Sequence, residues 1–492
     1  MKADFPEPYH SNIPVKDRKT GKRARVSFPF MLPHEVLAVV ILAMGVAFHH
    51  IIEFAPGSGL DTMKQDFRKS HQIPATAPLV PIGIHGDGVA LHKRMSMEVV
   101  SFDICSAPKS KKYCFSVVEK QDLCDCGCGG RCTLDAMLEI FRWSLMVLYT
   151  GNTPQQRHDG TAWLPSDKSR CSDSSPLTFR GCLLQSRGDW PWFKWLFGFK
   201  GWNSPDYVCW RCRANSSTIP YWDASPGAKW HKHRHTEGRF AALIRENGQQ
   251  MSPLFSIPGF TMMNICIDML HAVDLGIAQE IVGNVFFEAL GSFAPGKNRK
   301  LQLDELVVRM KDHYSRMRTR NRMTHLTMDM VRRDGKAPRL RAKGAETKHI
   351  VPFALEIATA QYAANEDDHA MNVLQCVSGL LDFYMASGLR PYPWKLAQDA
   401  CRTVSTAYVK LHAEADANDV LAWRIKPKLH IFMELGLYQT SELGDPESYW
   451  AYADEDHMGT VHQLTASRGG PSGPASAAVR VIERSRVLAS RG

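Results

Sequence analysis

The stretch that decides the fold of this chain is APLVPIGIHGDGVAL, residues 77–91, a short apolar run broken by glycines. Such a run predicts a β-strand that ends in a turn, with Asp87 exposed between two glycines at that end. The neighbouring segments MEVVSFDI (97–104) and YCFSVVEK (113–120) have strand-like spacing. A fourth strand candidate, TFRGCLLQSRGDW, covers 178–190.

One helix separates the third and fourth strand candidates. In LDAMLEIFRWSLMVLYTG (134–151) the apolar residues recur every three or four positions, and Gly151 stands where a helix would stop. The order β-β-β-α-β is typical of the mixed sheet of an RNase H-like α/β domain. Because 492 residues are too many for one simple core, we expect two or three structural units. The family resemblance given below implies that the core is interrupted by an insertion, and we assign the core to residues 78–200 and 425–492. A large, mainly helical, zinc-containing insertion is predicted at 201–424.

The N-terminal part is expected to lie outside this core. Residues 1–32 are predicted to be a flexible segment and residues 33–77 to be helical. The only membrane candidate is the 13-residue apolar run Val36–Phe48, and because a spanning helix needs about 20 residues we predict a buried helix and no membrane contact. The odd number of cysteines, 13, and the polar start of the chain favour a reducing compartment. The basic cluster KDRKTGKRAR (16–25) is a nuclear-import candidate.

The positive charge of the chain is concentrated in one segment. The formal net charge is +10, and residues 297–348 hold 16 Lys or Arg against 6 Asp or Glu, so this segment accounts for all of it. A basic segment of this kind suits a polyanion such as double-stranded DNA; the alternative is a solvated basic linker. The arginines that we expect to contact DNA are Arg316, Arg318, Arg320, Arg322, Arg332, Arg333, Arg339 and Arg341.

Acidic residues at three places predict a divalent-cation site. Asp87 and Asp189 end strand candidates that would be neighbours, and carboxylates that share two ions about 4 Å apart form two-metal sites for Mg²⁺ or Mn²⁺. Asp454, Glu455 and Asp456 lie within one helical turn, so only one of them can point at the site, and Glu455 has the longest reach. Taken singly, a Gly-Asp pair is more often a turn and an acidic triplet a solvated helix start.

Longer motifs resemble CACTA-type transposases. RGDWPWFKWLFGFKGWNSPDYVCWRC (187–212) resembles the family segment in which an Asp-Phe-Pro strand end precedes a Leu-x-Gly-Trp turn and a Cys-x-x-Cys pair. IKPKLHIFMELG (425–436) is similar to the family's His-containing helix, and SYWAYADEDHMGTV (448–461) to its Trp-x-Tyr-x-x-Glu-Arg-x-x-Gly helix. NICIDMLHAVDLG (264–276) resembles the Asp-x-Met-His block of CACTA and related fungal transposases. The chain is also similar in style to transposon-derived reading frames abundant in dinoflagellate genomes.

The resemblance implies a nuclear DNA transposase that cleaves DNA and transfers strands at transposon ends. It implies that Asp87, Asp189 and Glu455 form a DDE triad, and a homo-oligomer is a further expectation. Asp456 stands where the family has Arg, which favours the alternative of a catalytically inactive, zinc-containing DNA-binding or structural protein. Supporting roles are assigned to Asp268, His271, Asp454, Asp456 and His430. For the two histidines the alternative is a buried, hydrogen-bonded role.

Two cysteine clusters are candidates for structural Zn²⁺. Cys209 and Cys212 form a Cys-x-x-Cys pair that suits a tetrahedral metal, and WHKHRH follows about 20 residues later. The predicted ligands are Cys209, Cys212 and two of His231, His233 and His235. The alternative is a semi-buried cysteine pair beside a surface histidine run. The second candidate, CDCGCGGRC, contains Cys124, Cys126, Cys128 and Cys132; the alternative there is a reduced, Gly-rich loop.

Overall fold

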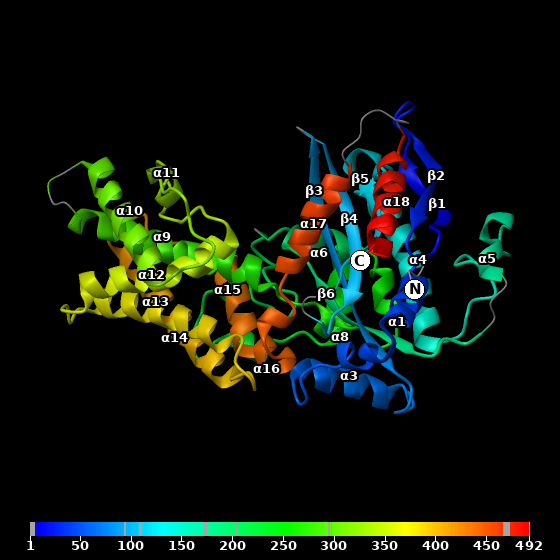
Figure 1. The fold of residues 1–492 in the computed structure, drawn as a ribbon. Helices are drawn as coiled ribbons and strands as arrows, with labels where there is room; N and C mark the ends of the chain where they lie inside the picture. Colours follow the sequence, from blue (N-terminus) through cyan, green and yellow to red (C-terminus); the bar gives the residue numbers. More distant parts are fainter. Residues whose placement is uncertain are drawn as a thin grey trace. The chain divides into compact units, whose positions relative to one another are not determined.

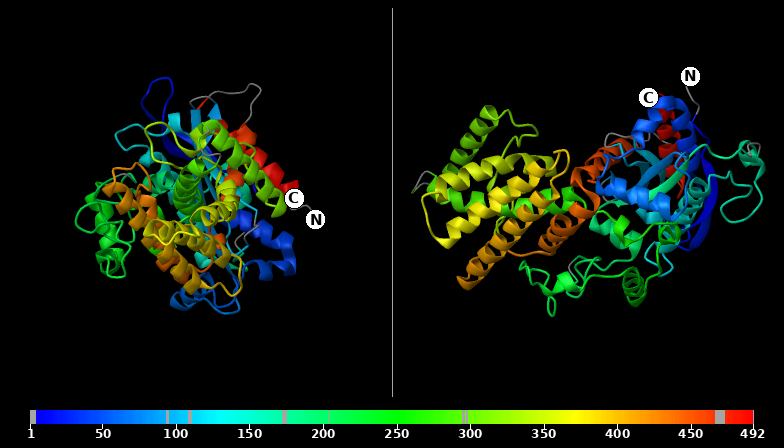
Figure 2. Two further views of the ribbon diagram at one scale, coloured as in Figure 1. Left: turned by 90° about the vertical axis from the view of Figure 1, so that its left-hand side faces the viewer. Right: turned by 90° about the horizontal axis from the view of Figure 1, so that it is seen from below.

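The computed structural model describes residues 5–92, 95–107, 111–171, 175–202, 204–293, 296, 298–465 and 473–491. The chain divides into two compact units, seen in Figures 1 and 2. Unit 1 consists of Met1–Gly201, Thr236–Cys266 and Ala451–Gly492, and unit 2 of Trp202–His235 and Ile267–Trp450. We expected the helical insertion at 201–424. The structure differs in two ways: residues 236–266 within that range belong to unit 1, and unit 2 continues beyond it to residue 450.

Unit 1 is built on a four-stranded mixed sheet in the order β5-β4-β3-β6. Strand β3 (Leu79–His92) pairs antiparallel with β4 (Met95–Ile104) and parallel with β6 (Arg180–Arg187), and β4 pairs antiparallel with β5 (Tyr113–Glu119). Helix α4 (Arg131–Thr150) lies between β5 and β6 in sequence and supplies the crossover that a parallel pair needs. The predicted succession of three strands, one helix and a fourth strand is confirmed, and so is the mixed α/β class.

Helix α4 covers one face of this sheet because its apolar residues share one side. Leu134, Leu138 and Phe141 are fully buried at spacings of three and four residues, and the ring of Phe141 lies 5.1 Å from that of Phe115 in β5. The helix ends at Gly151, whose left-handed conformation (φ 66°) lets its N–H bond back to the Val147 carbonyl.

Residues 9–30 form a β-hairpin, so the prediction of a flexible segment is wrong there. Strand β1 (Tyr9–Lys16) pairs antiparallel with β2 (Arg23–Phe30) over their full lengths. Tyr9, Ser11 and Ile13 are buried while His10 and Asn12 between them are exposed, and this alternation stabilises a strand with one buried face. The hairpin continues into the sheet region, since the N–H of Met31 donates to the Phe115 carbonyl at 2.9 Å.

The apolar run that follows the hairpin is helical as predicted but only partly buried. Helix α1 (Pro33–Met44) buries Val36 and Leu37, whereas Leu42 is 81% exposed. The stretch Pro33–Ile51 is the one described segment that is long and apolar enough to cross a membrane, a test that core helices also pass. The expected buried helix is therefore wrong for its second half, and the lack of membrane contact remains a prediction.

Further helices complete unit 1. They are α2 (Phe48–Ile51), α3 (Gly59–Ser70), α5 (Lys168–Cys171), α6 (Trp190–Phe197), α8 (Glu237–Glu246), α17 (Tyr452–Thr465) and α18 (Ser476–Arg491), with short 3-10 turns at Gly45–Ala47, Lys120–Asp122, Pro165–Asp167, Pro253–Ser256 and Met262–Asn264. Helix α17 packs against β3, and α18 packs against β5 and β2 (Figure 1). Helices α17 and α18 therefore belong to the sheet unit, whereas residues 425–450 of the expected C-terminal part of the core belong to unit 2.

Unit 2 is helical. Its elements are α7 (Lys229–Lys232), the π-helix η6 (Leu270–Ile277), α9 (Ala278–Ala289), α10 (Arg299–Arg316), α11 (Met328–Val331), α12 (Gly344–Tyr362), α13 (Asp368–Ala386), α14 (Trp394–Ala417), α15 (Pro427–Glu434), the π-helix η8 (Leu435–Gln439) and α16 (Thr440–Leu443), with 3-10 turns at Leu290–Ser292 and Pro446–Ser448. Helix α13 packs between α12 and α14 (Figure 2).

Candidate functional site

Asp87 lies inside strand β3 rather than at its end. The strand continues to His92 with Asp87 opposite Val99 of β4, so the predicted turn at this point is wrong. The preceding glycine has a packing role instead, because a Cβ on Gly86 would lie 2.2 Å from the indole ring of Trp192. The half-buried Asp87 carboxylate accepts a hydrogen bond from the neighbouring Gly88 N–H at 2.6 Å.

Asp189 follows strand β6 by two residues and begins helix α6. Its half-buried carboxylate accepts the Trp192 N–H at 2.8 Å, which caps the helix. In the parallel register of β3 and β6, His85 lies opposite Arg187. Asp87 and Asp189 each come two residues later, so the register brings both positions to the same level of the sheet, where β6 ends.

Helix α17 carries the acidic triplet, and its three members have different environments. Asp454 is fully buried, Glu455 is half-buried and Asp456 is exposed. Asp454 is the member that binds the sheet: its carboxylate accepts hydrogen bonds from Arg187 Nε at 2.8 Å and Nη2 at 3.0 Å. The supporting role predicted for Asp454 is thus structural, which leaves Glu455 as the candidate ligand on this helix.

The Arg187–Asp454 pair belongs to a buried cluster of four charges. Arg187 Nη2 also donates to Asp103 of β4 at 2.8 Å, and Lys112 bridges Asp103 and Asp454, at 3.2 Å from the latter. The side chains of all four are less than 10% exposed. Gly83 makes room for the cluster, because a Cβ there would lie 2.1 Å from Arg187 Nη1. Among these four side chains the two cations balance the two anions.

The cluster sets the protonation of its members. Burial alone would raise the pKa of Asp454, but the positive charges of Arg187, His85 and Lys112 outweigh it and hold that pKa well below its ordinary value. The pKa of Asp103 is lowered in the same way against its burial, chiefly by Arg187 and Lys112. At His457, one turn from Asp454, burial outweighs the nearby carboxylates and lowers the pKa to about 4, so its imidazole is neutral at pH 7.

Cysteine and histidine side chains form two metal-binding geometries. Among the described residues, two groups of at least three potential ligands have all ligand atoms within 4.8 Å of one another. They are Cys124, Cys126, Cys128 and Cys132 in unit 1, and Cys209, Cys212, His430 and Glu434 in unit 2. Asp87, Asp189 and Glu455 belong to neither group.

The unit 2 group is fully buried and joins a loop to helix α15. Cys212 Sγ lies 3.1 Å from His430 Nε2, and Cys209 Sγ lies 3.6 Å from Glu434 Oε1. His430 and Glu434 stand at i and i+4 on α15, so both point the same way. The His430 Nδ1 lies 3.1 Å from the Tyr221 carbonyl, to which it donates, so the Nε2 atom faces the cysteines, as in a metal-bound histidine.

Interactions within the unit 2 group favour a deprotonated Cys209 and a protonated Cys212, because burial and the hydrogen bond to Cys209 raise the pKa of Cys212 well above its ordinary value. Burial would raise the pKa of Cys209, but hydrogen bonds from Cys212 and His430 outweigh it and lower that pKa to about 6. Both oxygens of Glu434 lie within 2.8 Å of Arg234 Nη1, and Arg211 Nε approaches one of them at 3.4 Å. Two cysteines and a histidine are therefore the available inner ligands, with Glu434 held beside them by arginines.

The predicted histidine ligands differ from the one that meets the cysteines. Residues 231–235 run beside 211–213, with Cys212 paired to Arg234 across the two segments. His231 Nδ1 bonds the Tyr438 hydroxyl at 2.6 Å, and His233 Nδ1 bonds the Lys229 carbonyl at 2.7 Å. His235 is buried outside the group. The i, i+4 spacing of His430 and Glu434 in a predicted helix was the signal that could have found this site.

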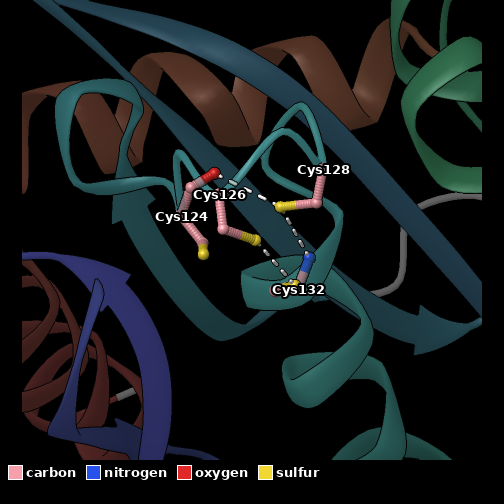
Figure 3. Close-up of side chains that lie close together, drawn as sticks. All are labelled: Cys124, Cys126, Cys128 and Cys132. Atoms are coloured by element: carbon pink, nitrogen blue, oxygen red, sulfur yellow. Dashed lines mark hydrogen bonds between the residues drawn. The ribbon is translucent and has the colours of Figure 1, made fainter. Parts of the chain in front are cut away.

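The unit 1 group lies in the loop before helix α4 (Figure 3). Cys126 Sγ and Cys132 Sγ are 3.6 Å apart, and the Cys132 N–H donates to Cys128 Sγ at 3.5 Å. Cys124 is buried, Cys126 is exposed, and the other two are half-buried. The predicted second cluster is thus brought together in space, with its sulfurs converging on one point.

The Asp-x-x-His pair at Asp268 and His271 is a local structure. Asp268 is buried and accepts the Leu270 N–H at 3.0 Å and the His271 N–H at 3.2 Å. His271 Nδ1 lies 2.6 Å from the same carboxylate. These contacts lie at the start of the π-helix η6. They agree with the alternative considered for this pair, a hydrogen-bonded structural role.

The arginines of the basic segment are of two kinds. Five are exposed: Arg316, Arg318, Arg320, Arg322 and Arg333. Three are half-buried: Arg332, Arg339 and Arg341. Arg339 donates to the Gln279 side chain at 2.8 Å and to the Leu275 carbonyl at 3.1 Å. Its backbone lies against α9 where a Cβ on Gly283 would be 2.4 Å away. Arg339 therefore packs unit 2 rather than presenting a free cation.

No protein-family model matches this chain, and no curated protein matches it at a significant level.

Proposed function

We propose that this chain is a DDE transposase-like protein that cleaves and joins DNA at transposon ends with Mg²⁺ or Mn²⁺. The sheet supports an RNase H-like assignment of unit 1: its order β5-β4-β3-β6, its single parallel pair and the crossover helix α4 are the arrangement expected of that class. Helix α17, packed against β3, is in the place of the helix that carries the third acid.

The observation that carries the proposal is the register of β3 and β6. It brings Asp87 and Asp189 to one level of the sheet, at the carboxyl end of β6. The Arg187–Asp454 ion pair anchors α17 to the same two-strand region and leaves Glu455 beside its buried neighbour. The helix is fixed again at its far end, where His462 Nδ1 lies 2.6 Å from the Ala90 carbonyl.

Carboxylate oxygens are the ligands that Mg²⁺ and Mn²⁺ prefer, so Asp87, Asp189 and Glu455 would hold the ions. Bound there, the ions would activate a water or a 3′-hydroxyl and stabilise the leaving oxygen. The protein's own part would be to position these three acids and to neutralise other charge. The buried cluster would do the second task, because it pairs Asp103 and Asp454 with Arg187 and Lys112.

Unit 2 has features of a zinc-stabilised DNA-binding insertion. Cys209, Cys212 and His430 would hold a structural Zn²⁺, with Glu434 as the fourth ligand or as a hydrogen-bond partner. The exposed arginines between Arg316 and Arg333 supply cations for backbone phosphates, which predicts strongly salt-dependent DNA affinity. A nuclear location and a homo-oligomer follow from the same proposal.

The test compares Asp189→Asn with the wild-type chain. Asn caps helices as well as Asp does, so this variant keeps helix α6 and removes only the charge. With a supercoiled plasmid and Mn²⁺, the wild type should nick the DNA and Asp189→Asn should not. The control Asp399→Asn changes an aspartate whose side chain is 73% exposed, far in sequence from the acids, and should nick normally. Equal nicking by wild type and Asp189→Asn would refute the catalytic role.

A second candidate is the catalytically inactive, zinc-containing DNA-binding protein. It is favoured by the local hydrogen bonds of two acids: Asp87 accepts from Gly88 and Asp189 from Trp192. Calorimetric titration with Mn²⁺ separates the two functions. Binding that disappears in Asp189→Asn supports the nuclease, whereas no carboxylate-dependent binding together with intact plasmid binding supports the inactive form.

A further inference from the structure

We propose that Cys124, Cys126, Cys128 and Cys132 bind one Zn²⁺ ion as four thiolates, and that this ion clasps the start of helix α4 to the β1–β2 hairpin and to helix α6. The site is separate from the buried group of unit 2 and independent of the proposed nuclease activity. It is argued from the sulfur geometry, the backbone of the loop and the contacts that the loop makes.

The sulfur positions suit a shared metal, and the four cysteines are reduced in this structure. In a tetrahedral site with Zn–S bonds of about 2.3 Å the sulfurs lie about 3.8 Å apart. Cys126 Sγ and Cys132 Sγ are 3.6 Å apart, and all four sulfurs lie within 4.8 Å of one another. A disulfide requires about 2.05 Å, and all four residues are free thiols.

The loop is shaped so that its sulfurs turn inward (Figure 3). Gly127, Gly129 and Gly130 have φ angles of 87°, 58° and 86°, in the left-handed region that side chains other than glycine rarely adopt. Cysteines two positions apart in an extended chain would lie far from one another. The reversals of the backbone at these glycines bring their sulfurs together instead. The turn is closed by the Gly130 N–H, which donates to the Cys124 carbonyl at 3.2 Å.

The surroundings can balance a negatively charged tetrathiolate. The Cys132 N–H donates to Cys128 Sγ at 3.5 Å, as backbone amides do around bound thiolates. The group lies at the N-terminus of α4, a helix of 20 residues whose dipole favours negative charge there. Lys16 reaches the loop from β1 and bonds Asp125 at 2.7 Å.

The loop connects three parts of unit 1. On the hairpin side, the Cys124 N–H donates to Thr133 Oγ1 at 2.9 Å, and that hydroxyl donates to the Pro14 carbonyl at 2.7 Å. On the other side, Arg131 Nη1 donates to the carbonyls of Trp195 at 2.5 Å and Leu196 at 3.0 Å, at the end of α6. Binding of an ion by residues on both sides of Arg131 therefore fixes the loop, the hairpin and α6 together.

Zinc is the ion that these ligands favour. Soft thiolates select Zn²⁺, Cu⁺ or iron–sulfur clusters, and a tetrahedral set of four sulfurs around one point suits Zn²⁺. The two centres differ in donor set, because the unit 2 group offers two sulfurs and one imidazole. Substitution with Co²⁺ distinguishes them: the thiolate charge-transfer absorbance of the four-sulfur site should be about twice that of a two-sulfur site.

The first experiment measures the number of zinc ions per chain in the purified full-length protein by inductively coupled plasma mass spectrometry. The double variant Cys126→Ser, Cys132→Ser should contain one zinc fewer per chain than the wild type. Cys171→Ser, which changes an exposed cysteine outside both groups, should lose none. Unchanged zinc content in the double variant would overturn the proposal.

The second experiment uses only the wild-type chain, so it does not depend on the folding of a variant. Iodoacetamide labelling is followed peptide by peptide before and after zinc removal by a chelator and after zinc is restored. Cys126, Cys128 and Cys132 should be protected with zinc and react at least tenfold faster without it, while Cys171 should react equally in all three states. Equal labelling of the cluster with and without zinc would overturn the proposal.

Discussion

Arg187 and Asp454 lie 267 positions apart in the sequence and are joined by two hydrogen bonds, from Nε at 2.8 Å and from Nη2 at 3.0 Å. The pair ties the last residue of strand β6 to the first turns of helix α17. Both side chains are at least 97% buried, so neither charge can be satisfied by water if the other is lost.

Removing this cation should strongly destabilise unit 1. Arg187→Met leaves Asp103 and Asp454 facing each other with Lys112 alone, and breaking a buried ion pair costs about 3–5 kcal/mol. Denaturant unfolding measures the loss of free energy. The matched control is Arg402→Met, because Arg402 pairs with Asp399 on the surface, where ion pairs contribute about 0–1 kcal/mol. Equal effects of the two substitutions would contradict the role assigned to the cluster.

Acid should unfold unit 1 through the same carboxylates. The pKa of Asp454 is held below its ordinary value of 3.8, so its contribution is complete above that value and is lost as the pH falls below it. The melting temperature of the wild type should therefore fall more steeply between about pH 4 and pH 2 than that of Arg187→Met, which lacks the cation that lowers this pKa. Parallel melting profiles would show that other groups dominate acid unfolding.

Substitutions of Asp189 should separate its structural role from its chemical role. Asp189→Ala removes the cap of helix α6 and should lower stability by about 1 kcal/mol, whereas Asp189→Asn should stay within a few tenths. Thermal melting gives the stabilities and plasmid nicking gives the activities. If Asp189→Asn is as unstable as Asp189→Ala, the charge itself stabilises the fold and the nicking test needs correction for folded fraction.

Gly86→Ala should destabilise the region beside Asp87. The added methyl would meet the ring of Trp192 at 2.2–2.4 Å, and overpacking of this kind costs about 1–3 kcal/mol. Trp192→Leu in the same chain should recover part of the loss. Gly459→Ala is the opposite control, because nothing lies within 4 Å of its Cβ in helix α17 and alanine favours helices by about 1 kcal/mol. Denaturant unfolding of the four chains checks all three effects.

Peroxide should release zinc from the two proposed sites at different rates. Hydrogen peroxide takes two electrons from a pair of thiolates, which form a disulfide, and with two protons it yields two molecules of water. Cys126 and Cys132 are 3.6 Å apart and Cys126 is exposed, whereas Cys209 and Cys212 are only 1% exposed. A colorimetric zinc indicator should show one equivalent released early and one late. A single phase of two equivalents would contradict this order.

The strands and the crossover helix could be predicted because their signals are local. Apolar alternation and stop residues marked β3, β4, β5, β6 and α4 to within a few residues. The hairpin at 9–30 was missed because its prolines and charges conceal the alternation of Tyr9, Ser11 and Ile13, which becomes visible only when α4 and β5 cover that face.

The candidate sites were harder to predict because they depend on pairing between distant segments. Cys209 and Cys212 were identified from spacing, but their histidine partner His430 is 218 residues from Cys212, and the nearer histidines are turned away by backbone pairing. The role of Gly86 was also misjudged, since the sequence does not show that Trp192 lies beneath it. No sequence motif indicates the buried cluster around Arg187, because its four charged residues come from four separate segments of the chain.

The division of unit 1 among three stretches of chain affects the order in which the protein is completed during synthesis. The sheet and Arg187 emerge from the ribosome early, whereas Asp454 follows only after all of unit 2 has been made. Until then, Arg187 faces Asp103 and Lys112 without its principal partner. A nascent chain halted before residue 451 therefore has a complete set of strands but an open, charged sheet face, so the final 42 residues govern when unit 1 can close.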